Sequence, residues 1–178
     1  MDDKKRTYDT VVAQAQCLVD GVTNHVGALA NITALLKEAF PYYFWVGFYL
    51  VKDDQLELGP FQGPVACYTI GKGRGVCGTS WAQVQTLIVP DVEQFPGHIA
   101  CSSRSRSEIV VPILRNGNVV GVIDVDSEQL NSFDTIDQEG SASLWCNQTI
   151  KQHPASGLHL DDTTACSFLQ PQSVIKPK

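Results

Sequence analysis

Two aspartates interrupt a stretch that otherwise has the composition of a buried strand. Residues 119–126 are valine, isoleucine and glycine apart from Asp124 and Asp126. Because side chains two positions apart in a strand point to the same face, we expect the two carboxylates to lie side by side. Glu108 begins the preceding apolar segment, and an Asn-Gly pair at 116–117 favours a tight hairpin between the two segments. The pattern therefore predicts three carboxylates on one face of a sheet.

Such a cluster is costly in a dry interior, because burial disfavours each charge and like charges repel one another. A cation would offset the cost, and either a metal ion or the ammonium group of a ligand could supply it. The structural alternative is that the strand end is exposed and that Asp124 and Asp126 cap the following turn. The pattern by itself leaves both interpretations open.

Cysteines form the second group that could carry chemistry, and the chain has six of them. Cys17 lies at an apolar position of a helical pattern, which is typical of a buried, inert thiol. Cys67, Cys77 and Cys101 instead lie beside glycines or at the start of a loop. A thiol in such a place is accessible, so these three are the candidates for reactivity.

Two kinds of chemistry suit these cysteines. Thiol redox chemistry needs one accessible thiolate and a second cysteine, and Arg104 and Arg106 could lower the pKa of a nearby thiol. The alternative is a zinc site built from Cys67, Cys77, His98 and Cys101. Zinc is disfavoured because only His98 and Cys101 are closely spaced and no Cys-x-x-Cys occurs. We expect no metal, and three unreactive thiols remain the structural alternative.

An aromatic stripe and a glycine run complete the candidates. Trp45 and Tyr49 lie four residues apart in a strand-like segment, so one face carries both. They could wall a pocket for a small ligand, although such a stripe more often belongs to a core. The glycine run at 71–75 has neither the Rossmann nor the P-loop spacing, and we interpret it as a turn that lets Cys77 approach another loop.

The elements that position these residues follow from hydrophobic periodicity. Helical spacing over residues 8–40, interrupted at Gly21 and Asn24, predicts two helices or one broken helix. A short helix is expected at 76–83. Strands are expected at 44–51, 55–59, 65–70, 87–89, 108–114 and 119–126. The fold class is α+β, an antiparallel sheet backed by the N-terminal helices.

Length and charge exclude several classes of function. A chain of 178 residues predicts one domain, which we place at 1–153, followed by a disordered or loosely docked tail at 154–178. The net charge of −6 and the lack of a basic run disfavour binding to nucleic acid or to a membrane. No apolar stretch approaches a membrane span and the N-terminus lacks a signal peptide, so we expect a cytoplasmic protein.

Seven segments closely resemble the free methionine-(R)-sulfoxide reductases, a family of GAF-domain enzymes that are typically homodimeric. They are WVGFY (45–49), LGPFQG (58–63), VAC (65–67), GRGVCG (73–78), PGHIAC (96–101), SEIVVP (107–112) and GVIDVDS (121–127). The likeness covers residues 8–139 and implies a GAF-like fold. It does not extend to the C-terminus, where residues 140–147 keep little of the family's closing amphipathic helix and the tail is atypical.

The resemblance implies an oxidoreductase that protects against oxidative stress. It also implies roles in the reaction for Cys67, Cys77 and Cys101. Cys101 would attack the sulfoxide sulfur and become a sulfenic acid as methionine leaves. A second thiol would condense with the sulfenic acid to a disulfide, with Cys67 as the first choice and Cys77 as the alternate. Thioredoxin would reduce that disulfide with electrons from NADPH, which thioredoxin reductase delivers. No cofactor would be bound to the protein itself.

The resemblance also implies roles for the acids and the aromatic residues. Glu108, Asp124 and Asp126 would bind the α-ammonium of the substrate and assist at the sulfoxide oxygen, while Trp45 and Tyr49 would pack its S-methyl end. Selectivity for the free amino acid follows, because a residue within a peptide has no ammonium. The alternative is a GAF domain that senses a small molecule without turnover, although such sensors are normally fused to an output domain.

Overall fold

The centre of the structure is one antiparallel sheet, seen in a computed structural model that describes residues 2–99 and 101–146. Its order is β3-β2-β1-β6-β5-β4. The six strands are β1 (Trp45–Lys52), β2 (Gln55–Gln62), β3 (Thr69–Gly71), β4 (Leu87–Val89), β5 (Ser107–Arg115) and β6 (Asn118–Ser127). The predicted β5–β6 hairpin is confirmed, β1 and β2 form a second hairpin, and β1 and β6 join the two at the centre.

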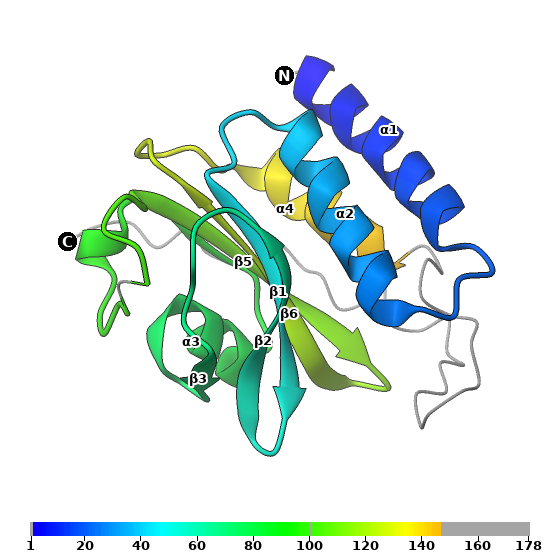
Figure 1. Cartoon of the computed structure of the whole chain (residues 1–178). Coiled ribbons are helices and arrows are strands. Elements are labelled where there is room, and N and C mark those ends of the chain that lie inside the picture. The colour runs from blue at the N-terminus through cyan, green and yellow to red at the C-terminus, as the bar shows by residue number, and fades with distance from the viewer. Residues whose placement is uncertain (1, 100, 147–178) are drawn as a thin grey trace.

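Helices cover the two faces of the sheet unequally (Figure 1). Three of them, α1 (Asp2–Val19), α2 (His25–Ala39) and α4 (Thr135–Cys146), lie on one face. The other face carries α3 (Gly75–Gln83), while a 3-10 turn, η1 (Val92–Gln94), follows β4. The predicted interruption between the first two helices is confirmed, because Asn24 caps α2 by accepting a hydrogen bond from the Gly27 amide at 3.0 Å.

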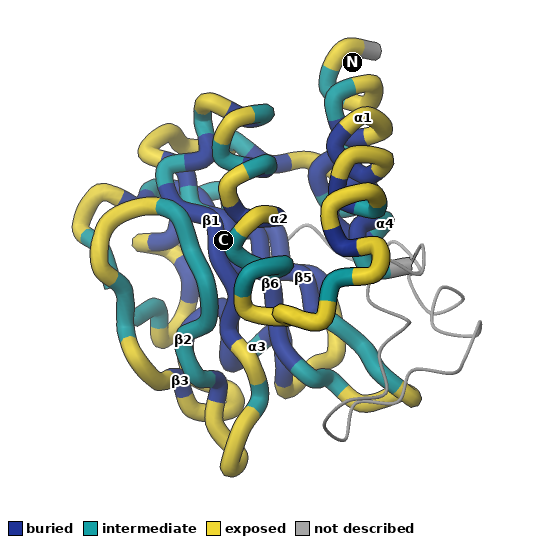
Figure 2. Tube along the Cα trace, turned by 45° about the vertical axis from the view of Figure 1, so that its right-hand side comes forward, coloured by how far each residue is buried: buried dark blue, intermediate teal, exposed yellow. Residues whose placement is uncertain are grey.

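Strand alternation divides the interior into two cores. Val46, Phe48, Ile109 and Ile123 point to the three-helix layer. Trp45, Tyr49, Val110 and Val122 point to the α3 side. The central strands β1, β6 and β5 are buried along most of their length (Figure 2). Glu108 is two residues from Val110, and Asp124 is two residues from Val122. Both acids therefore lie on the α3 side of the sheet, where the candidate functional residues gather.

The expectation that helical structure is lost at residues 140–146 is wrong, because α4 continues through Cys146. Gly140 is a poor helix former in isolation, but α1 packs directly against it. A Cβ at Gly140 would lie 2.2 Å from the ring of Tyr8, so only glycine permits this approach. Asp137 then accepts hydrogen bonds from Tyr8 at 3.0 Å and from Lys4 at 2.5 Å, joining α4 to α1. Tertiary packing here overrides helix propensity.

Two further expectations need correction. The strand expected at 65–70 is only Thr69–Gly71, because two carbonyls of the preceding segment accept hydrogen bonds from side chains of β1. Cys17, expected in the interior, is exposed on α1. None of the described helices combines the length and apolar character needed to cross a membrane. The predicted tail at 154–178 lies outside the described residues.

Candidate active site

The three carboxylates come together as the hairpin predicts. Glu108 lies opposite Asp126 in the β5–β6 register, and Asp124 lies opposite Val110. Glu108 and Asp124 are buried, with 6% and 7% of their surface exposed. Burial raises the pKa of Asp124 to about 6. Burial, reinforced by the Asp124 charge, also raises the pKa of Glu108 and of Asp126 well above the usual carboxyl range.

Cys77 lies within this acidic cluster and not in a mobile loop. It occupies the first turn of α3, is 3% exposed, and its Sγ donates a hydrogen bond to Glu108 Oε1 over 3.9 Å. Burial, and after it the Asp124 charge, raises the pKa of the thiol well above its usual value. The expectation of an accessible Cys77 is therefore wrong, and the thiol is held neutral beside the carboxylates.

The glycine run explains how Cys77 reaches that position. Gly78 lies so close to the end of β3 that a Cβ would be 2.2 Å from the carbonyl oxygen of Gly71. Gly75 adopts a positive φ of 58°, and a Cβ there would lie 3.3 Å from the Ile99 side chain. The run packs α3 tightly against the sheet and brings it next to the loop that carries Cys101.

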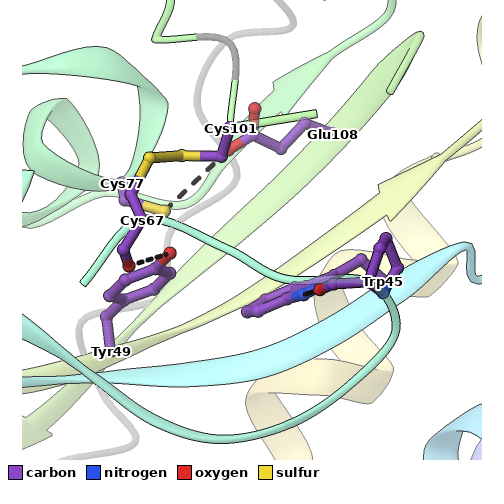
Figure 3. The surroundings of a disulfide bond; sticks show 7 residues. Trp45, Tyr49, Cys67, Cys77, Cys101 and Glu108 are labelled. Carbon is purple, nitrogen blue, oxygen red and sulfur yellow. Dashed lines mark hydrogen bonds between the residues drawn. A yellow bond between two sulfur atoms is a disulfide. The ribbon is translucent and has the colours of Figure 1, made fainter. Parts of the chain in front are cut away.

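A disulfide joins Cys67 to Cys101 beside the cluster, with 5.6 Å between their Cα atoms (Figure 3). The two cysteines lie 34 residues apart in sequence, on separate loops that meet over the α3 face. Both are half-buried. As disulfide partners they offer no thiolate for a metal, so the site considered from Cys67, Cys77, His98 and Cys101 is not assembled in this state.

The arginines expected to activate a thiol are directed elsewhere. Arg104 pairs with Glu128 at 2.5 Å and stacks on the ring of Phe44, 4.6 Å from its centroid. Arg106 lies 3.9 Å from a carboxylate oxygen of Glu93. Neither lines the pocket that contains Cys101, whereas Arg74 does. Arg74 was not among the predicted site residues, although its position between two glycines shortly before Cys77 is a signal in the sequence.

An aromatic wall lines the pocket along β1, the strand that pairs with β6 and its two acids. Trp45 and Tyr49 lie on one face of β1, as predicted, with ring centroids 6.0 Å apart. Trp45 Nε1 donates to the carbonyl of Pro64 at 3.1 Å, and the Tyr49 hydroxyl donates to the carbonyl of Cys67 at 3.1 Å (Figure 3). These bonds tie the segment that carries Cys67 to the wall, so the disulfide and the aromatic rings keep a fixed relation.

A single pocket unites these groups. The residues that line it include Trp45, Tyr49, Cys77, Cys101, Glu108, Asp124 and Asp126, together with His98, Ile99 and Ser105. Ser105, which the sequence analysis did not single out, hydrogen-bonds the Asp126 carboxylate and favours its charged form. The pocket thus combines buried negative charge, an apolar aromatic wall and the redox-capable Cys101, whose disulfide partner Cys67 is not among the lining residues. It suits a small cation with an apolar end that reacts with thiols.

Comparison with known proteins agrees with this geometry. The GAF domain family matches residues 28–159. GAF domain-containing protein A of Dictyostelium discoideum is 59% identical over 137 residues, covering 76% of this chain and 86% of that protein. Free methionine-R-sulfoxide reductase of Escherichia coli is 43% identical over 142 residues, covering 80% and 86% respectively.

A solved structure extends the similarity to three dimensions. Free methionine-R-sulfoxide reductase from Neisseria meningitidis, determined in complex with its substrate, superposes with a TM-score of 0.77 at 52% identity. The match covers 79% of this chain and 85% of that one. Both the fold and the sequence of the site-bearing region are therefore shared with proteins of that name.

Proposed function

We propose that this chain, which belongs to the GAF-domain family of free methionine-R-sulfoxide reductases, reduces free methionine-(R)-sulfoxide to methionine with cysteine thiols. The observation that carries the proposal is the Cys67–Cys101 disulfide beside the pocket of buried acids. It supports an oxidised resting state in which two cysteines have already given up their electrons. A ligand sensor needs neither a sulfur pair at its pocket nor a buried anionic cluster next to it.

In the proposed reaction the reduced enzyme binds the substrate ammonium among Glu108, Asp124 and Asp126, with the S-methyl end against the aromatic wall. The Cys101 thiolate attacks the sulfoxide sulfur, the oxygen passes to Cys101 as a sulfenic acid, and methionine leaves. A carboxyl group that keeps its proton at neutral pH assists at the sulfoxide oxygen. The raised pKa of Glu108 makes it the group best suited to that role.

The second half of the cycle restores the thiols. Cys67 condenses with the sulfenic acid, forming the disulfide and releasing water, and a dithiol protein of the thioredoxin type then supplies two electrons and two protons. Cys67 suits the resolving role better than Cys77, which is buried and hydrogen-bonded to Glu108. Val65 and Tyr68, on either side of Cys67, are 86% and 84% exposed, which leaves apolar surface for the reductant.

The remaining parts of the proposal follow from the chemistry and from the family. Reduction by a thioredoxin-type protein fits the reducing conditions of the cytoplasm. NADPH then acts through thioredoxin reductase and need not bind this chain. We also propose a homodimer, in keeping with the family, and assign residues 1–153 to the catalytic domain.

Cys67→Ser is expected to separate chemistry from recycling. The variant should still form about one equivalent of methionine per chain in a single turnover, because Cys101 remains. Multiple turnover with thioredoxin should fall by at least about tenfold, because no resolving thiol forms the disulfide. Cys17→Ser, which changes an exposed thiol of α1, is the matched control and should turn over normally. Unchanged steady-state turnover of Cys67→Ser would assign resolution to another cysteine.

The kcat/KM for free methionine-(R)-sulfoxide is expected to decrease as the pH falls through about 6, the raised pKa of Asp124. The sign follows from the shift: above that pH the carboxylate is ionised and binds the ammonium, and below it the charge is lost. The slope should approach about tenfold per pH unit. A pH series of kcat/KM on wild type and Asp124→Asn checks this, since the variant should lack this limb. A flat wild-type profile from pH 5 to 8 would contradict the role of Asp124.

A further inference from the structure

The acidic cluster contains a ligand set that differs from an ordinary ammonium site. Cys77 Sγ and one carboxylate oxygen each from Glu108 and Asp124 all lie within 4.8 Å of one another, and all three residues are buried. Substrate binding by charge alone requires only the carboxylates. The thiol, which comes from α3 while the acids come from β5 and β6, has no role in the proposed redox cycle.

A second observation shows that this cluster is open to a further ligand. Asp124 lines the pocket, and only 7% of its surface is exposed. Its Oδ1 nevertheless has no hydrogen-bond partner among the described residues. Arg74 and His98 also line the pocket, but within residues 2–99 and 101–146 neither forms an ion pair with the three acids. An orphaned buried carboxylate oxygen is costly and marks a place for a cation.

We propose that Cys77, Glu108 and Asp124 form a binding site for a divalent transition-metal cation of the Zn²⁺ type, which competes with the substrate ammonium. One thiolate and two carboxylates are Zn²⁺ ligands, and three protein ligands leave a fourth position open to the pocket. The thiol proton and the proton held by Glu108 pass to solvent when the Zn–S and Zn–O bonds form. Mg²⁺ and Ca²⁺ prefer oxygen ligands alone and gain nothing from Cys77.

The distances allow this coordination with small movements. Around a tetrahedral Zn²⁺ with Zn–S of about 2.3 Å and Zn–O of about 2.1 Å, sulfur and oxygen lie about 3.6 Å apart. Cys77 Sγ and Glu108 Oε1 are 3.9 Å apart. That pair needs a contraction of a few tenths of an ångström, and the Asp124 oxygen, which lies within 4.8 Å of the other two ligand atoms, needs at most a little more than about 1 Å, which side-chain rotation supplies. A bound metal would occupy the carboxylate oxygens that the ammonium needs, so the two ligands exclude each other.

Cobalt titration tests the site without any assay of activity. The oxidised full chain, in which Cys67 and Cys101 are a disulfide, is titrated with Co²⁺ and the near-ultraviolet thiolate-to-cobalt absorption is recorded. We expect one equivalent of Co²⁺ to bind per chain. Zn²⁺ should displace the bound Co²⁺, whereas Mg²⁺ at the same concentration should not. Cys77→Ser should abolish the thiolate-to-cobalt absorption, whereas Cys17→Ser, an exposed thiol outside the pocket, should leave it unchanged.

A second variant keeps the test decisive if Cys77→Ser does not fold. Asp124→Asn keeps the thiol and should retain the absorption while weakening Co²⁺ at least tenfold. The proposal is overturned if the wild type shows no thiolate-to-cobalt band, if Cys77→Ser keeps it, or if Asp124→Asn binds Co²⁺ as tightly as the wild type.

Competition with the substrate rests on the proposed function and is measured separately. Cys101→Ser, which cannot turn over, is loaded with Co²⁺, and each epimer of free methionine sulfoxide is added. Both epimers chelate cobalt equally in solution, so an excess displacement by the R epimer reports binding in the pocket. Equal displacement by the two epimers would contradict the competition and the proposed substrate, while the metal site itself would stand on the direct titration.

Discussion

Cys101→Ser is expected to abolish reduction of free methionine-(R)-sulfoxide, with turnover below about 1% of wild type. A serine hydroxyl has nearly the size of a thiol but does not ionise near neutral pH, so no nucleophile remains to attack the sulfoxide sulfur. The fold should persist, because Cys101 is half-buried in a loop and the α3-side core does not depend on its sulfur. Steady-state and single-turnover assays on purified protein, with thermal unfolding of both forms, measure the effect.

A trapping experiment, together with the activity of Cys101→Ser, distinguishes Cys101 from Cys77 as the nucleophile. Trapping with a sulfenic-acid reagent in the Cys67→Ser background should label Cys101, because the sulfenic acid then lacks its resolving partner. A label on Cys77, or more than a few per cent of residual activity in Cys101→Ser, would move the nucleophile to Cys77. The buried, neutral state of Cys77 is the reason for expecting the first result.

N-acetylation of the substrate is the second large effect we expect. The acetyl group removes the ammonium and leaves the ionised carboxylates of the acidic cluster desolvated without a counter-charge. By analogy with breaking a buried ion pair, the loss is about 3–4 kcal/mol. That corresponds to a decrease in kcat/KM on the order of 10²-fold to 10³-fold. Measuring kcat/KM for the free and the N-acetyl (R)-sulfoxide under identical conditions tests this expected decrease.

Two variants show that the effect belongs to the pocket. Asp124→Asn should weaken the free substrate while doing little to rescue the acetylated form, because the enclosing walls remain. Glu139→Gln removes the same charge from an exposed position of α4 and should change neither value. Comparable kcat/KM for the free and acetylated substrates in the wild type would refute both the ammonium assignment and specificity for the free amino acid.

Local patterns were sufficient to predict much of the site. The alternation in 119–126 and the Asn-Gly turn placed Asp124, Asp126 and Glu108 on one face, because strand parity and hairpin register depend on neighbours in sequence. The same parity put Trp45 and Tyr49 on one wall. Apolar spacing predicted two N-terminal helices or one broken helix. These features rest on short-range rules that hold wherever the strand or helix is placed.

Accessibility was harder to predict, because it depends on what packs against a residue. Cys17 occupies an apolar position of its helix but is exposed, since α2 and α4 pack against a neighbouring strip of α1. Cys77 lies among glycines and is buried, because those glycines permit close packing and not mobility. Residues 140–146 form a helix despite poor propensity, because Tyr8 packs on Gly140.

By itself the sequence determined the class of fold, the face that carries the acids and, through its resemblance to a family, the chemistry to expect. Only the tertiary structure decided which cysteines pair: Cys67 meets Cys101, while Cys77 joins the carboxylates. The physical reason is the distance along the sequence that separates the two partners. Residues 34 positions apart meet only where two loops cross over a folded sheet, and no local periodicity encodes the path of those loops.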